Sequence, residues 1–298
     1  MNIENRMEKG EMPKIHLSIA RHDKQVKTEG VPDEELELTS EGRAHAVAQA
    51  ELEDISQAVA FGSPRARAQQ TAGLAMAGAS GGITGDETLA ELREKLDHGF
   101  PNGKGSKLVI DPRLNFVIDE KTEYGKQATK AFGDGNYLNF LVEQSDELAK
   151  QAGDKETTTY SRQAANVASI VEKYMKVAPR WNQLVTDPES RQDQSQEYTN
   201  TLERYLRTHG GVGESFLAKV LEHMKGPEER DRFIHNVGGA GFKHSEGFDV
   251  NISLSESGEP LVHVRYEKQG ETPEESFIFD EDVSAEVIAA IAQGGEIS

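Results

Sequence analysis

A strand that ends abruptly in an Arg-His pair constrains this chain most. Between residues 14 and 20, apolar side chains occupy every second position, the period of a strand with one buried face. The alternation stops at Arg21 and His22. In open α/β sheets, ligands bind beyond the carboxyl ends of the strands. The pair therefore marks a candidate anion site, because a guanidinium fork matches phosphate oxygens and a neutral imidazole offers a lone pair. An exposed pair without a role is the structural alternative.

Size and charge limit the classes of protein that this chain can be. Its 298 residues suffice for one large domain, here 14–298, after a flexible N-terminal arm, 1–13. The net charge of −19 argues against nucleic acid or an anionic membrane as a partner. The absence of Cys excludes disulfides and thiolate metal sites. No apolar run is long enough to span a membrane, so we expect a soluble, cytoplasmic protein.

A second strand and the helix after it carry another candidate residue. Residues 57–62 form a short apolar run closed by Ser63 and Pro64, which suit a helix cap and first turn. Arg67 then lies early in a helix at the carboxyl edge of a strand. Two arginines in one turn also suit a solvated helix face.

Two further segments bring chemistry to the same edge. The polar helix 89–96 and the loop after it would deliver a carboxylate, with Glu94 the first candidate and Glu91 and Asp97 its rivals. His209 follows the segment 202–208 and precedes two glycines, so it is either a turn residue or a second imidazole facing His22.

Helices and a hairpin account for most of the rest. Helical spacing predicts a core-facing helix over 161–178 that ends at Pro179, and a weaker helix over 134–148. Alternation over 248–266 around a Ser-Gly turn predicts a C-terminal β-hairpin. We interpret 105–200 as an inserted, mainly helical cap region lying over the sheet.

The order of these motifs resembles the histidine phosphatase superfamily, the phosphoglycerate-mutase-like fold. Arg21-His22 resembles its first motif, and residues 63–72, Ser-Pro-Arg-Ala-Arg-Ala-Gln-Gln-Thr-Ala, resemble its second. Residues 38–44, Leu-Thr-Ser-Glu-Gly-Arg-Ala, are similar to a further family segment. The resemblance covers about 15–96 and resumes at His209. It implies a three-layer α/β/α sandwich with a mostly parallel central sheet.

The resemblance also implies roles for single residues. His22 would attack the phosphoryl group and be phosphorylated transiently, while Arg21, Arg67 and His209 hold its oxygens. Glu94 would protonate the leaving oxygen and then activate water. The implied activity is metal-independent and cofactor-free hydrolysis of a phosphomonoester or a phosphorylated side chain. The substrate would be a small phosphorylated molecule.

Departures from the family pattern define the alternatives. Asp23 replaces the usual Gly and would place a carboxylate near the anion pocket. Residues 203–207 are unusually polar for a central strand. The mutase branch's Asn after the first His is missing, and Gly210 stands where the acid phosphatase branch has Asp. Hydrolysis is therefore favoured over mutase activity. The alternatives are a catalytically weak or inactive member that binds a phosphorylated ligand, and a protein that binds a protein partner.

Overall fold

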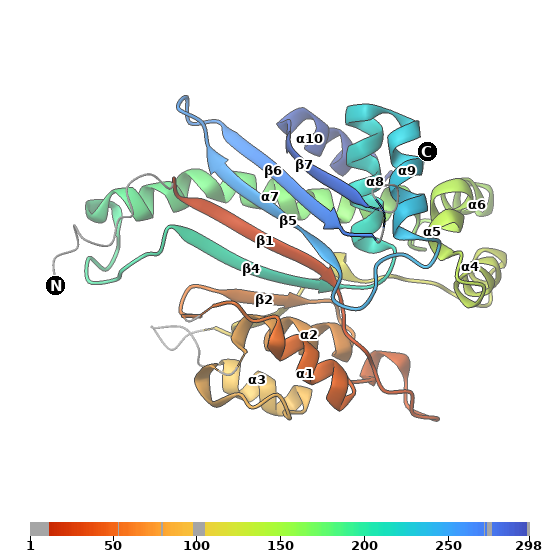
Figure 1. The fold of residues 1–298 in the computed structure, drawn as a ribbon, viewed down its shortest axis with the longest axis horizontal. Coiled ribbons are helices and arrows are strands. Elements are labelled where there is room, and N and C mark those ends of the chain that lie inside the picture. Colours follow the sequence, from red (N-terminus) through yellow and green to blue (C-terminus); the bar gives the residue numbers. More distant parts are fainter. Residues whose placement is uncertain are drawn as a thin grey trace.

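A mixed seven-stranded sheet organises the computed structural model, which describes residues 12–52, 54–78, 80–97, 105–270, 272 and 276–296. The strand order is β3-β2-β4-β1-β5-β6-β7 (Figure 1). The predicted arm lies outside the described residues, except for its last two positions. The strands are β1 (Lys14–Arg21), β2 (Val59–Gly62), β3 (Leu108–Ile110), β4 (Thr201–Thr208), β5 (Gly247–Leu254), β6 (Pro260–Lys268) and β7 (Phe277–Val283).

The sheet has a parallel half and an antiparallel half. β3, β2, β4 and β1 run parallel, whereas β5 pairs antiparallel with β1 and continues into β6 and β7. The predicted hairpin is confirmed as β5 and β6. Because β1 and β4 are parallel neighbours, their carboxyl ends meet at one edge, where Arg21 pairs with Thr208.

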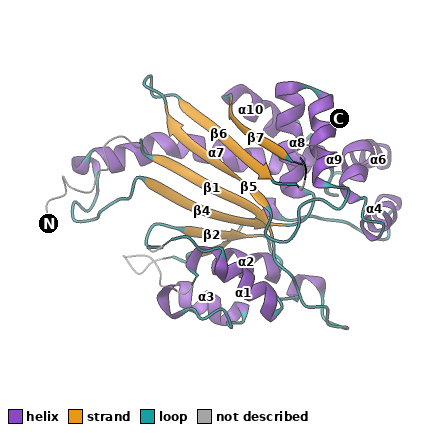
Figure 2. Cartoon of the chain, viewed as in Figure 1, coloured by secondary structure: helices purple, strands orange, loops and turns teal. Residues whose placement is uncertain are grey.

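Helices cover the sheet from both sides, as the predicted sandwich requires (Figure 2). On one side, α1 (Ser40–Ala48), α2 (Ala66–Ala77) and α3 (Leu89–Asp97) share a core with β2 and β3. On the other, α7 (Tyr160–Thr186), α8 (Val212–Lys225), α9 (Pro227–Val237) and α10 (Ala285–Gln293) share a core with β1 and β5–β7. The remaining helical segments are α4 (Glu123–Gly133), α5 (Tyr137–Phe140), the π-helical η5 (Leu141–Ser145), α6 (Asp146–Ala152), and the 3₁₀ turns η2 (Asp33–Glu35), η3 (Ser80–Gly82), η4 (Pro112–Leu114) and η6 (Pro188–Ser190).

The region 105–200 is more than a cap. It supplies strand β3 to the sheet edge, and α7 packs on β1, β5 and β6 as part of a sandwich layer. Only the residues between β3 and α7, with α4, α5 and α6, lie beyond the carboxyl ends of the strands. The prediction that the long helix ends at Pro179 is wrong, because α7 continues to Thr186. Burial of Trp181 and Val185 in the core compensates for the hydrogen bond that proline cannot donate.

The polar strand β4 is accommodated by partners on neighbouring strands. His16 on β1 lies 2.6 Å from Glu203 on β4 and 2.9 Å from Asp249 on β5. Although burial opposes it, hydrogen bonding to both carboxylates raises the pKa of His16 to about 9, so the ring carries a proton at neutral pH. Arg207 is buried and donates to the carbonyl oxygen of Ser18 at 3.0 Å.

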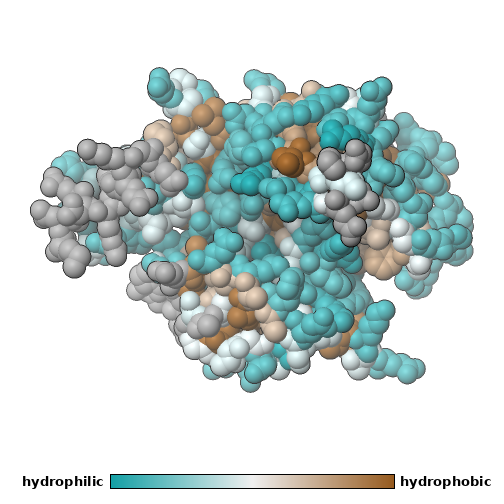
Figure 3. Space-filling model, in the orientation of Figure 1, coloured by the Kyte–Doolittle hydropathy of each residue, from teal (hydrophilic) through white to brown (hydrophobic). Residues whose placement is uncertain are grey.

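These side chains belong to the sheet face on which α1–α3 lie, but those helices pack on the parallel half only. In Figure 1, no labelled helix lies in front of β1, β5 and β6, and this face is mainly hydrophilic in Figure 3. Within the described part of the chain, no helix is long and apolar enough to cross a membrane.

Candidate active site

The two predicted imidazoles lie side by side at the carboxyl edge of the sheet. His22 follows β1 and His209 follows β4, at the same level of the register. Their ring centroids are 5.0 Å apart, and the rings meet edge to face. Both side chains are buried, with exposed fractions of 6% and 2%. The parallel pairing of β1 and β4 is therefore what joins two motifs almost two hundred residues apart.

Hydrogen bonding gives one nitrogen of His22 the lone pair that a nucleophile needs. Nδ1 lies 2.7 Å from the carbonyl oxygen of Asp23, which can only accept, so Nδ1 carries the hydrogen. Nε2 then carries the lone pair, and Nε of Arg67 donates to it at 3.1 Å. Burial, reinforced by the charge of Arg67, holds the pKa of His22 well below its usual value. The ring is therefore neutral at pH 7.

His209 is oriented through the start of the second motif. Its Nε2 lies 2.7 Å from Oγ of Ser63, which also accepts from the backbone N–H of Arg65 at 3.2 Å. The Ser63 oxygen has a second lone pair and a hydroxyl hydrogen, so this contact is compatible with either tautomer of His209. Among the described residues, the buried Nδ1 of His209 has no partner. Burial, followed by the positive charges around it, lowers the pKa of His209 well below its usual value.

Close packing of strand and helix positions the arginines. A Cβ on Gly62, the last residue of β2, would lie 2.5 Å from Cα of Gln69 in α2, so glycine lets the helix begin against the strand end. Arg65 occupies the N-cap position of α2, and Arg67 lies in the first turn of this helix. Arg21 comes from β1 and donates through Nη1 to the carbonyl oxygen of Phe242. Three guanidinium groups thus converge from two motifs.

A carboxylate of the chain itself, that of Asp33, occupies the space between the guanidinium groups of Arg65 and Arg67, which we call the guanidinium fork. Oδ2 of Asp33 accepts from Nη2 of Arg67 at 3.0 Å and from Nη1 of Arg65. The backbone oxygen of Asp33 accepts from Nη1 of Arg67 at 2.7 Å. Neither Asp33 nor Arg65 was predicted as a site residue: the loop before α1 carries no local signal except its polarity, and Arg65 at the start of α2 also suits a solvated helix face. A bound carboxylate demonstrates that the fork suits an oxyanion.

Asp23 does not face this fork, contrary to the expectation from sequence. Its carboxylate accepts from the backbone N–H of Lys24 at 2.7 Å and from Oγ of Ser245 at 2.8 Å, and it pairs with Nδ1 of His45 at 2.5 Å. The side chain is buried and does not line the cavity. Its negative charge is therefore satisfied away from the anion pocket.

The structure does not bring the predicted acid to the pocket. Glu94 lies on the exposed face of α3 and does not line the cavity. Asp97 is likewise exposed, and Glu91 accepts from the backbone and hydroxyl of Thr88 at 2.9 and 2.8 Å. Helical periodicity explains this placement, since Leu92 and Leu96 turn toward the core and their neighbours turn outward.

The cavity at this edge measures ≈ 830 Å³. Four of the five predicted site residues line it, namely Arg21, His22, Arg67 and His209. Its titratable lining also includes Asp33, Glu34, Glu120 and His244, and the ring centroid of His244 is 6.2 Å from that of His22. Its apolar lining comprises Phe116, Ile118, Ala128, Phe132 and Tyr137. In the described part of the chain, no group of three or more His, Asp or Glu residues is arranged to hold a metal ion.

Similarity to known proteins is found in structure alone. No protein-family model and no curated protein matches the sequence. The structure of a mycobacterial glucosyl-3-phosphoglycerate phosphatase is 16% identical, with 81% of this chain and 92% of that chain covered and a TM-score of 0.44. A phosphoserine phosphatase mutant of Entamoeba histolytica, in complex with phosphoserine, is 15% identical, with coverages of 84% and 95% and a TM-score of 0.40. Likeness at this level says nothing about the reaction of this chain.

Proposed function

We propose that this protein hydrolyses phosphate monoesters through a phosphohistidine formed on His22. The observation that carries the proposal is the geometry of that ring. A backbone carbonyl fixes its hydrogen on Nδ1, so a neutral Nε2 lone pair lies beside three arginines and a second imidazole. A phosphomonoester needs both features, a nucleophile for phosphorus and cationic donors for its oxygens.

The first step transfers the phosphoryl group to His22. Nε2 attacks phosphorus while the bond to the ester oxygen breaks, and the leaving oxygen takes up a proton. Arg67, which now donates to Nε2, turns its N–H toward a phosphoryl oxygen, and the unpartnered Nδ1 of His209 donates to another in the tautomer that carries its hydrogen there. Asp33 must leave the fork for the phosphoryl oxygens to replace its carboxylate.

The second step releases phosphate. Water attacks phosphorus, the bond between phosphorus and Nε2 breaks, and the base that deprotonates the water regenerates the acid. Glu94 does not fit this role from its position on α3. Asp33 does not fit the acid role either, because the guanidinium groups of Arg65 and Arg67 hold its carboxylate through hydrogen bonds. Glu34, Glu120 and His244, which line the same cavity, are the groups we propose as donors.

A second candidate function is the binding of a phosphorylated ligand without turnover. The position of Glu94, the expected proton donor, favours it, because Glu94 lies on the exposed face of α3 and does not line the cavity. Both functions require the same anion pocket. They differ in whether phosphate becomes attached to His22.

A trapping experiment distinguishes the two. The full chain is incubated with p-nitrophenyl phosphate, quenched in alkali, which preserves phosphohistidine, and digested for mass spectrometry. We expect a phosphoryl group on the peptide that contains His22, and turnover that is abolished in His22→Asn. His263→Asn, which changes a histidine on distant β6, is the matched control and should retain full activity. Turnover by His22→Asn would refute the mechanism, whereas phosphate binding without any turnover would support the binding protein.

A further inference from the structure

The cavity has two chemically different sets of lining residues. We call the arginines and histidines its cationic end, and the five apolar or aromatic side chains, which all come from residues between β3 and α7, its apolar end. Hydrolysis of a phosphate ester requires only the first end. At ≈ 830 Å³ the cavity also has far more room than a phosphate group needs, and its size is typical of sites that enclose a whole small molecule.

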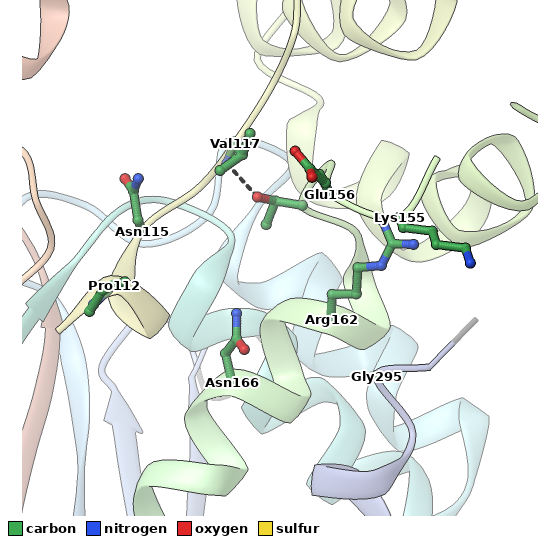
Figure 4. Close-up of a pocket in the computed structure, with 9 residues that line it drawn as sticks. Pro112, Asn115, Val117, Lys155, Glu156, Arg162, Asn166 and Gly295 are labelled. Carbon is green, nitrogen blue, oxygen red and sulfur yellow. Dashed lines mark hydrogen bonds between the residues drawn. The ribbon is translucent and has the colours of Figure 1, made fainter. Parts of the chain in front are cut away.

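The apolar end is built by the residues between β3 and α7. Ala128 and Phe132 come from α4, one helical turn apart and thus on the same face, and Tyr137 begins α5. Phe116 and Ile118 come from the extended segment that follows η4. This segment alternates, because its other two residues, Asn115 and Val117, line a neighbouring pocket (Figure 4). One face of the segment is therefore directed at the cavity.

Phe116 joins the two ends of the cavity. The guanidinium carbon of Arg65 lies 4.1 Å from the centroid of its ring, and the His209 ring meets it edge to face at 4.9 Å. These contacts hold the aromatic ring directly beside the proposed phosphoryl site. A group attached to the bound phosphate would touch it first.

Phe132 extends the apolar surface to the rim of the cavity. Its ring packs edge to face on Tyr137 at 5.8 Å, yet its exposed fraction is 59%. An aromatic side chain this exposed gains little from folding, because most of its surface stays in water. Because Phe132 lines a cavity next to an anion site, an apolar group of a ligand could cover its ring, and the burial of that ring would then stabilise the complex.

We propose that the substrate is a small phosphomonoester whose alcohol or phenol carries an aromatic ring or an aliphatic chain of several carbons. This inference rests on the proposed function, since it takes the arginine and histidine end as the phosphate site. The anion binds at that end, and the apolar group lies along Phe116, Ile118 and Phe132. Small polar esters, which leave this surface uncovered, are poorer ligands.

Binding of phosphonates tests the inference without requiring turnover. Their P–C bond is not hydrolysed. Phenylphosphonate and methylphosphonate carry the same anionic group and differ only in the apolar group attached to it. By calorimetry with the full chain, we expect phenylphosphonate to bind about tenfold tighter or more, as burial of one ring predicts. Equal affinities would overturn the inference and leave the phosphatase proposal standing.

Variants locate the effect. Phe132→Ala removes an exposed ring, so we expect this variant to fold. It should bring the ratio of the two affinities, phenylphosphonate over methylphosphonate, toward one. Ile118→Ala should lower this ratio as well. Val117→Ala is the matched control, because Val117 belongs to the same segment but lines the neighbouring pocket. A ratio that stays unchanged in Phe132→Ala and Ile118→Ala would refute the apolar site. If the ratio behaves as expected but no ester is hydrolysed, the ligand class stands and the phosphatase proposal fails. Binding of neither phosphonate would refute both.

Discussion

The carboxylate of Asp33 lies 3.0 Å from Nη2 of Arg67, the same arginine whose Nε–H donates to His22. One guanidinium group thus connects an internal anion with the proposed nucleophile. In the proposed mechanism, a phosphorylated ligand displaces that anion before its own oxygens reach Arg65 and Arg67, so we expect Asp33 to weaken the affinity of the pocket for phosphate.

Replacement of Asp33 by Asn removes the competing charge but keeps the shape of the side chain. We expect Asp33→Asn to bind inorganic phosphate about three- to tenfold tighter, with a gain that shrinks as salt is added. Calorimetry at two ionic strengths measures both effects. Glu35→Gln is the control, because Glu35 belongs to the same 3₁₀ turn but does not line the cavity. Equal or weaker binding by Asp33→Asn would contradict competition.

The proton donor can be identified from how strongly its loss slows substrates with different leaving groups. p-Nitrophenolate leaves without much help, whereas an alkoxide needs a proton. A variant that lacks the acid should therefore lose about 10²- to 10⁴-fold in kcat/KM for an alkyl phosphate and far less for p-nitrophenyl phosphate. We expect this pattern in one of Glu34→Gln, Glu120→Gln and His244→Asn. The same pattern in Glu94→Gln would contradict the placement of that residue outside the site.

Local patterns predicted the parts of the site that depend on single elements. The alternation before Arg21 and the Ser63-Pro64 helix start each place a side chain at a strand end, and parallel strand ends meet at one edge. The four predicted residues that line the cavity follow from this, whereas the three-layer fold was implied by the family resemblance. Asp33 could not be predicted in the same way, because its contacts with Arg65 and Arg67 join a loop to a helix more than thirty residues away.

The errors also have tertiary causes. Nothing near Pro179 in the sequence reveals that Trp181 and Val185 are buried, and their burial keeps α7 helical past the proline. The polarity of residues 203–207 suggested a poor central strand, yet the partners of Glu203 and Arg207 lie on β1. In each case, the stabilising contact comes from a distant segment that the local pattern does not contain.

The junction between β2 and α2 should not tolerate a larger residue than glycine. In Gly62→Ala, the new Cβ would lie 2.5 Å from backbone of α2, which carries Arg67, so helix and strand must separate. We expect a loss of about 1–3 kcal/mol in the free energy of unfolding and weaker phosphate binding. Urea denaturation and calorimetry measure the two. Gly133→Ala, at a position in α4 with nothing within 4 Å, is the control and should be neutral or slightly stabilising. An unchanged stability of Gly62→Ala would contradict the tight packing.

The His16 bridge makes the stability of the sheet depend on pH. Its pKa is raised to about 9 in the folded protein, so the folded state holds a proton that the unfolded chain releases near pH 6.5. The stabilisation is therefore complete below pH 6.5 and disappears as the pH rises through 9. We expect the free energy of unfolding of wild type to exceed that of His16→Gln by up to about 3 kcal/mol at pH 6, and we expect this difference to vanish by pH 10. Denaturation of both proteins across this pH range measures the difference. The contributions of the other titrating groups are the same in both proteins and therefore cancel. A difference that is constant with pH would mean that His16 contributes by packing and carries no charge.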